Sequence, residues 1–137
     1  MIEQILLIIG ATIFGILGTA HLLFTFFTNK FNAFDKSVTK AMKNTSPVLT
    51  KETTMWNAWI GFNASHSLGA MLVTAFYVPL VVTNMAFIRE SIWFSILPAI
   101  IGVAYLLLAK KYWFKIPFIG IFISTICFTG AAILINT

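Results

Sequence analysis

QILLIIGATIFGILGTAHLLFTFFT, residues 4–28, decides the fold class, because this apolar run is long enough to cross a lipid bilayer as a helix. Three further apolar runs of similar character follow at about 56–83, 91–109 and 116–135. A helix needs about 20 residues to span the hydrocarbon, and all four runs approach or exceed that length. The sequence therefore predicts an all-α protein, a four-transmembrane-helix bundle, with a single transmembrane domain covering residues 1–137.

The overall composition agrees with a polytopic membrane protein. The chain is 59% hydrophobic and only 9% charged, with a mean hydropathy of +0.93, whereas soluble domains are roughly 25% charged. Its N-terminal run lacks a preceding basic region and is too long for a signal-peptide core, so we expect a retained first span. Cys127 is the only cysteine, which excludes an intrachain disulfide and a cysteine metal cluster.

Basic residues are concentrated in two of the three predicted connections. Segment 29–55 contains five lysines against Asp35 and Glu52, and segment 110–115 contains three more lysines. Because lysine and arginine are retained on the cytoplasmic face, eight of the nine basic residues predict these two connections inside and both termini outside. The net charge of +5 needs no nucleic acid as partner, since a basic inner face beside anionic lipid is ordinary.

The first of these connections has a periodicity of its own. Four apolar residues recur at intervals of three and four, namely Phe31, Phe34, Val38 and Met42. Lysines are interleaved with them and Asp35 is available as an N-cap, which predicts a short amphipathic helix lying on the inner leaflet. The alternative is an ordinary cytoplasmic loop with incidental periodicity. Thr50 can cap the next helix, which we expect to begin near Lys51 and to enter the membrane around Trp56.

A polar cluster interrupts the second predicted span. On a helix, one stripe contains Trp59, Asn63, His66 and Ala70, with Ser67 flanking it. In the first span, His21 shares a stripe with Gly18 and Thr25. Counted from the inner ends of the two helices, the depths of the two histidines differ by roughly 5 Å at 1.5 Å per residue. We therefore expect the imidazoles at matching levels.

Such side chains are costly in hydrocarbon, so they usually face the interior of a bundle and find partners there. We expect a pocket between the first two spans that opens toward the cytoplasmic leaflet. Its expected ligand-binding residues are His21, Thr25, Trp59, Asn63, His66 and Ser67. The alternative is that these side chains only bond across helices and hold the bundle together.

The residue types limit the chemistry of such a site. Two histidines at one depth can be the axial ligands of a b-type haem, although the small residues beside them favour close helix approach instead. A catalytic metal usually has three protein ligands, and no carboxylate lies clearly within a span. A nucleophilic triad lacks a buried acid. General acid–base work by a histidine stays open, but the sequence favours a role without catalysis.

Two non-catalytic functions follow. The polar site can bind a hydrophobic or lipid-like ligand, or a partner subunit. Alternatively, the chain is an accessory subunit of a larger membrane complex, or a homo-oligomer. In that case small-residue and Phe-rich faces make the contacts, and the polar cluster only holds the helices of the bundle together. Membrane lipid is an expected partner in every case, and no nucleic-acid motif is present.

GTAHLLFTF (18–26) and TTMWNAWIGFNASHSLG (53–69), joined by a basic loop, resemble an uncharacterised family of small bacterial four-span membrane proteins. The resemblance covers most of the chain and is most specific around His21 and His66. It implies a four-span architecture and a bacterial inner (cytoplasmic) membrane, and it implies no activity. The layout is also similar to that of DoxX-like proteins, whose motifs are not matched here, so no functional residue is carried over.

Overall fold

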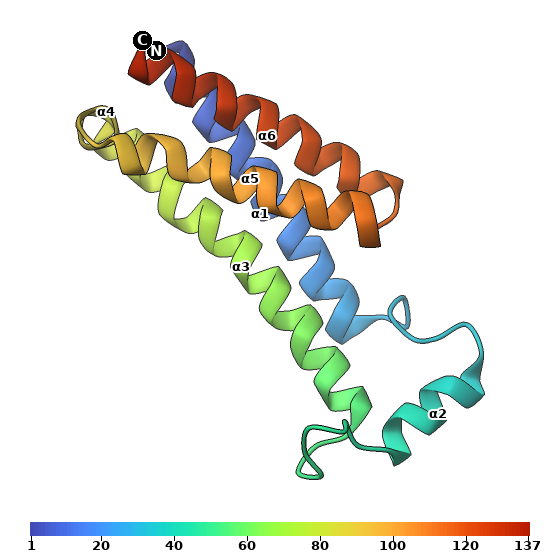
Figure 1. Ribbon diagram of the computed structural model, residues 1–137. Coiled ribbons are helices and arrows are strands. Elements are labelled where there is room, and N and C mark those ends of the chain that lie inside the picture. Colours follow the sequence, from blue (N-terminus) through green and yellow to red (C-terminus); the bar gives the residue numbers. More distant parts are fainter. The chain divides into compact units, whose positions relative to one another are not determined.

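The computed structural model describes residues 1–137 and contains only helices. In chain order these are α1 (Ile2–Phe27), α2 (Lys36–Asn44), α3 (Met55–Thr83), α4 (Met85–Glu90), α5 (Ile92–Tyr112) and α6 (Lys115–Asn136) (Figure 1). Helices α1, α3, α5 and α6 are long and apolar enough to cross a membrane. The prediction of an all-helical chain with four such helices is confirmed, and the predicted ends lie within three residues of the observed ones.

The outward faces of the four long helices are strongly apolar. More than half of the side-chain surface is exposed at Ile16 in α1, Leu72 in α3, Leu107 in α5 and Ile126 in α6. Extended apolar surface of this kind is rare on soluble monomers. It is the ordinary surface of a protein surrounded by lipid tails, which are as apolar as leucine.

The chain divides into two compact units. Unit 1 consists of Met1–Leu17 and Ala70–Thr137, and unit 2 is Gly18–Gly69. Helices α1 and α3 each contribute one part to each unit. The single transmembrane domain expected from the sequence stays a prediction.

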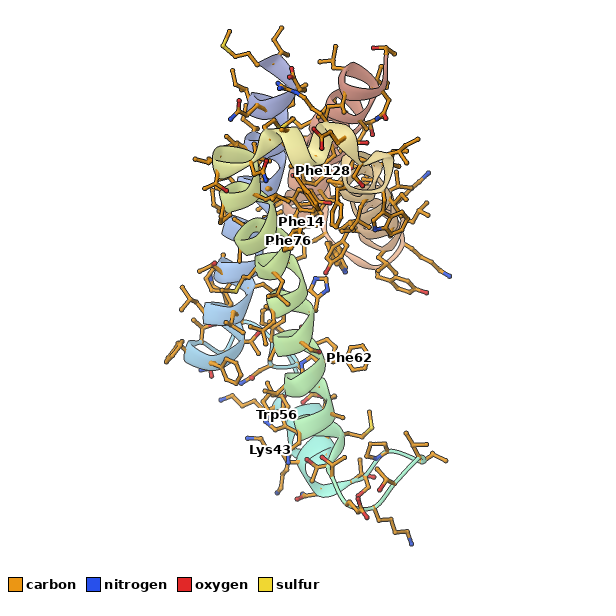
Figure 2. The ribbon with its side chains drawn as sticks, turned by 90° about the vertical axis from the view of Figure 1, so that its left-hand side faces the viewer. Phe14, Lys43, Trp56, Phe62, Phe76 and Phe128 are labelled. Atoms are coloured by element: carbon orange, nitrogen blue, oxygen red, sulfur yellow. The ribbon has the colours of Figure 1, made fainter.

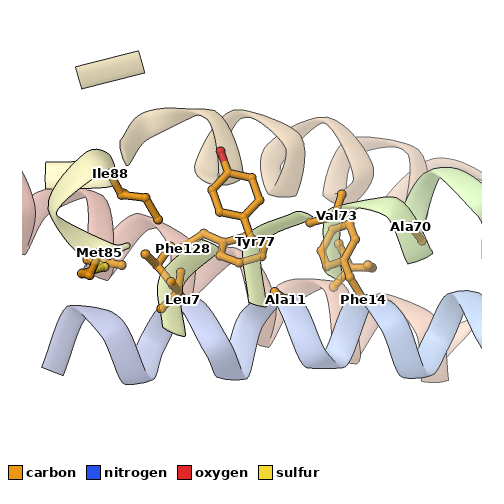
Figure 3. Packing of buried hydrophobic residues seen from close by; sticks show 12 residues of the cluster. Leu7, Ala11, Phe14, Ala70, Val73, Tyr77, Met85, Ile88 and Phe128 are labelled. Carbon is orange, nitrogen blue, oxygen red and sulfur yellow. The ribbon is translucent and has the colours of Figure 1, made fainter. Parts of the chain in front are cut away.

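The buried apolar core of unit 1 is built from four helices, and partly buried side chains of α5 pack against it. Figure 3 shows side chains from α1, α3, α4 and α6 meeting there, including Leu7, Ala11, Phe14, Val73, Tyr77, Ile88 and Phe128. The Phe14 ring lies 5.1 Å from the ring of Tyr105 and 5.7 Å from that of Phe128, measured between centroids. Edge-on and tilted contacts at these distances are favourable aromatic pairs. Gly10 permits this packing, because a Cβ atom there would lie 2.6 Å from the Phe128 ring.

Both chain termini lie at the same end of unit 1 (Figure 1). Helices α5 and α6 form an antiparallel hairpin, and Asn136 near the end of α6 donates to Ser95 Oγ near the start of α5 at 2.9 Å. Arg89 at the end of α4 donates to Glu3 Oε1 in α1 at 2.6 Å. The sequence reading did not include α4, a short helix whose N-cap side chain is Asn84. Polar contacts therefore fix the end that carries both termini.

Candidate functional site

Unit 2 holds every residue of the predicted ligand site, on the last part of α1 and the first half of α3. Helix α3 begins at Met55, and the Thr54 hydroxyl accepts a hydrogen bond from the Asn57 N–H at 3.1 Å. Thr54 is therefore the N-cap, and the expectation that Thr50 caps this helix is wrong. Thr50 instead accepts from the Glu52 N–H within the preceding turn, at 3.1 Å. The two threonines look alike in sequence, and only the path of the chain separates their roles.

One hydrogen bond joins the two helices at the centre of the site. Nε2 of His21 in α1 lies 3.0 Å from Oδ1 of Asn63 in α3. Asn63 is buried, and its amide nitrogen donates to the Trp59 carbonyl one turn earlier at 2.8 Å. Because the amide nitrogen is used in this way, the oxygen faces His21 and can only accept. Nε2 of His21 therefore carries a proton.

The two histidines lie against each other. Their ring centroids are 5.4 Å apart, and the ring planes are inclined at 73°, so one imidazole meets the other edge-on. Both side chains are half-buried. The similar depths of the two residues in their spans predicted a meeting of this kind. Together with Asn63 they form a compact polar group inside two otherwise apolar helices.

Thr25 and Ser67 are buried at the edges of this group and bond to their own helices. The Thr25 hydroxyl donates to the His21 carbonyl at 2.8 Å, and the Ser67 hydroxyl donates to the Asn63 carbonyl at 2.9 Å. Both bonds reach back one turn, a common arrangement for these residues in helices. The structure thus brings Thr25 and Ser67 to the site, but neither hydroxyl donates a hydrogen bond to the other helix.

Phe31 is a component of the site that sequence reasoning missed. Its ring lies 4.4 Å from the His21 ring between centroids, and its carbonyl accepts a hydrogen bond from Nε1 of Trp59 at 3.1 Å. Trp59 is 41% exposed, so the indole lies at the rim of the group. The periodicity had assigned Phe31 and Phe34 to the amphipathic helix, and this assignment is wrong, because α2 begins at Lys36. Only the path of the loop brings Phe31 back to His21.

Helix α2 follows this loop and is capped as expected. The Asp35 carboxylate accepts a hydrogen bond from the Ser37 N–H at 2.8 Å. Hydrogen bonding from the side chain and the backbone of Ser37 lowers the pKa of Asp35 below its usual value. The cap is therefore charged at neutral pH, and a negative charge is favourable at a helix N-terminus.

The arrangement of the histidines limits the metal chemistry of the site. No group of three or more His, Cys, Asp or Glu side chains is gathered closely enough to hold a metal ion. A bis-histidine haem needs a nitrogen from each imidazole directed at one iron atom. Nε2 of His21 is instead directed at the Asn63 oxygen. In this arrangement the two residues do not fit a haem held between them.

Comparison with known proteins gives no family for the chain. No protein-family model, no curated protein and no solved structure matches it. The resemblance to small bacterial four-span proteins therefore stays a prediction.

Proposed function

We propose that this chain is a small integral membrane protein that binds the polar head of a hydrophobic or lipid-like ligand at the histidine site. The histidine site is defined as His21, Thr25, Trp59, Asn63, His66 and Ser67, with Phe31 added from the structure. The observation that carries the proposal is the edge-on contact of two imidazoles, 5.4 Å apart, from two apolar helices. Ionisable residues within membrane spans are rare and usually mark ligand or ion sites.

Helix association alone accounts for only part of this group. A single bond between His21 and Asn63 is enough to tie α1 to α3 within unit 2. Thr25 and Ser67 add no donation across the helices, because each hydroxyl donates to its own backbone. The His66 imidazole lies against that of His21 and adds a second ionisable ring to the group. Two ionisable rings paired within apolar helices favour ligand binding over a purely structural role.

The side chains indicate the kind of ligand head. Imidazole, amide and indole groups exchange hydrogen bonds without carrying a fixed charge at neutral pH. None of the residues of the histidine site is a carboxylate or a lysine. Phe31 and Trp59 add flat apolar surface beside the polar atoms. An uncharged polar head on a hydrophobic body is the ligand that suits this combination.

The charge pattern supplies the proposed orientation. With segments 29–55 and 110–115 on the cytoplasmic side of a bacterial inner membrane, both termini are outside. The histidine site then lies in the cytoplasmic half of the bilayer, because it occupies the last part of α1 and the first half of α3. A ligand would reach it from the inner leaflet.

Native mass spectrometry of the protein, extracted from its membrane in mild detergent, tests the proposal. We expect a bound small molecule on the wild-type chain and its loss from His66→Leu. Ser65→Ala is the matched control, because the exposed Ser65 hydroxyl donates to the carbonyls of Gly61 and Phe62 in its own helix. Circular dichroism and gel filtration check that both variants fold. Equal retention by His66→Leu, or no adduct on any variant, contradicts ligand binding.

The second candidate is an accessory subunit that docks on a membrane partner beside the same site. Phe62, one residue before Asn63 in α3, is 79% exposed (Figure 2), which suits contact with another protein as well as with lipid. Affinity purification in the same detergent distinguishes the two functions. A stoichiometric protein partner lost on Phe62→Ala, without any small-molecule adduct, would favour the accessory subunit.

A further inference from the structure

Three large apolar side chains are almost completely exposed outside the four long helices. Phe34 lies just before α2, and Val48 and Leu49 lie shortly after it. Their exposed fractions are 108%, 110% and 94% respectively. Helix α2 itself buries none of its residues. The connection between α1 and α3 therefore presents apolar side chains at two places, one on each side of α2.

Hydrogen bonds shape both of the loops that carry these side chains. In the first loop, the Ala33 N–H donates to the Thr39 hydroxyl at 3.2 Å. In the second, the Thr50 N–H donates to the Pro47 carbonyl at 3.3 Å, directly around Val48 and Leu49. The Met55 N–H then donates to the Thr45 carbonyl at 2.8 Å. The loops are thus folded with Phe34, Val48 and Leu49 outward.

Lysines accompany these apolar side chains along the sequence. Residues 28–54 contain five lysines, three of them on α2 (Lys36, Lys40 and Lys43), against Asp35 and Glu52. The Asp35 carboxylate already accepts from the Ser37 N–H. Nζ of Lys43 lies 5.1 Å from the centre of the Trp56 ring (Figure 2), and Nζ of Lys30 lies 3.8 Å from that of Phe24. Lysines next to aromatic rings are typical of the level where a helix leaves the bilayer.

We propose that residues 28–54 dock on the anionic phospholipid surface of the membrane that the four long helices cross. Phe34, Val48 and Leu49 insert among the acyl chains, and the lysines lie at the phosphates. Charge complementarity selects lipid as the occupant, because a basic segment is attracted to an anionic leaflet. Exposed apolar side chains beside basic ones are the usual composition of an interfacial anchor. The side chains that carry this inference, Phe34, Val48, Leu49 and the lysines, lie outside the histidine site, so it does not depend on ligand binding there.

The structure places the exposed apolar side chains at other positions than the sequence pattern predicted. The pattern assigned insertion to one face of a single helix, through Phe31, Phe34, Val38 and Met42. Phe31 is turned to His21 instead, and Phe34 lies in a loop. The apolar contacts thus flank the lysines of α2 at both of its ends.

Fluorescent probes on the full chain in lipid nanodiscs test the docking. Phe34→Cys and Leu49→Cys carry a polarity-sensitive dye in a Cys127→Ala background, and Asn44→Cys, exposed at the end of α2, is the matched control. The discs contain phosphatidylcholine alone or with phosphatidylglycerol, and lipids brominated in their acyl chains serve as quenchers. In the discs with phosphatidylglycerol, we expect a blue shift and severalfold stronger quenching at 34 and 49 than at 44.

A lysine-depleted variant separates charge from apolar insertion. Lys36→Gln, Lys40→Gln and Lys43→Gln together should lower the docking equilibrium constant about a hundredfold on anionic discs, from about fivefold per lysine. Equal quenching at 34, 44 and 49 overturns the docking. Equal docking on discs with and without phosphatidylglycerol overturns the anionic selectivity. If the dyes at 34 and 49 are shielded in native membranes but not in pure lipid, the occupant of this surface is a protein partner and not the lipid surface.

Discussion

At the scale of single residues, the close approach of α1 and α3 in unit 1 depends on a glycine and a threonine. A Cβ atom at Gly15 would lie 2.6 Å from Thr74 Oγ1 and 3.0 Å from Thr74 Cβ. Thr74 cannot turn away freely, because its hydroxyl donates to the Ala11 carbonyl across the two helices. Small residues that let backbones approach, with a hydroxyl bonded between helices, are typical of packing within membranes. Composition indicated such packing, but not which glycine carries it.

Replacing Gly15 by alanine should therefore destabilise the fold. We expect a loss of about 1–3 kcal/mol, the usual range for an overpacked contact. Gly61→Ala is the matched control, because nothing lies within 4 Å of a Cβ atom there. It should gain about 0.5–1 kcal/mol from better helix propensity. Unfolding titrations in mixed micelles measure both, and a Gly15→Ala protein as stable as Gly61→Ala would show that Thr74 is not confined.

The Asn63 amide also fixes which nitrogen of His21 carries the proton. Since Asn63 donates to the Trp59 carbonyl, its oxygen accepts from Nε2 of His21. We expect ¹⁵N NMR spectra at neutral pH to show Nε2 protonated and Nδ1 unprotonated. Asn63→Leu removes the acceptor, so the spectrum should become a mixture of tautomers. A single Nδ1-protonated form in the wild-type chain would mean that the amide is oriented the other way.

At the scale of elements, the four long helices were predictable. Of the two short ones, α2 was anticipated with its Asp35 cap as one of two alternatives, and α4 was not anticipated. Length and hydropathy define a span, because every backbone group in hydrocarbon must be bonded within its own helix. The four long helices satisfy this without reference to the rest of the chain. Helix α4 and the start of α3 depend on which polar side chain caps the first turn, Asn84 and Thr54 respectively. The place of Phe31 in the histidine site depends on a loop path that no periodicity encodes.

The cap of α2 gives this element a dependence on pH. The pKa of Asp35 is lowered in the folded state by Ser37, so its stabilisation is present above the unfolded-state pKa and is lost as pH falls through the folded-state pKa. The protection of the amides of residues 36–44, measured relative to their intrinsic exchange rates, should therefore fall in acid, below about pH 4. Asp35→Ala should show fast exchange already at neutral pH. Asp35→Asn should stay protected and lose the acid transition, since asparagine caps equally well without titrating.

At the scale of the whole molecule, the charge pattern predicts how the chain is oriented in a membrane. Both termini, Arg89 and Glu90 lie at one end of unit 1, whereas three lysines surround the α5–α6 connection at the other end of those helices. The five remaining lysines follow the end of α1 that is opposite Met1. With the four long helices as membrane spans, we expect both termini on one side of the bilayer and the two lysine-rich connections on the other. The number of long apolar helices was predictable from the sequence because length and hydropathy do not depend on packing. The orientation of the chain stays a prediction.

Cysteine accessibility in intact bacterial cells tests that orientation directly. In a Cys127→Ala background, Thr137→Cys should react with a membrane-impermeant maleimide from outside, and Lys51→Cys should react only after the membrane is opened. Lys110→Gln, Lys111→Gln and Lys115→Gln together should leave this pattern unchanged, because five lysines still oppose the single arginine. Labelling of Lys51→Cys in intact cells would show that the topology is the opposite of the one predicted. The histidine site would then open to the outer leaflet, and the lysines of α2 would face a different lipid surface, so this measurement decides from which side a ligand arrives.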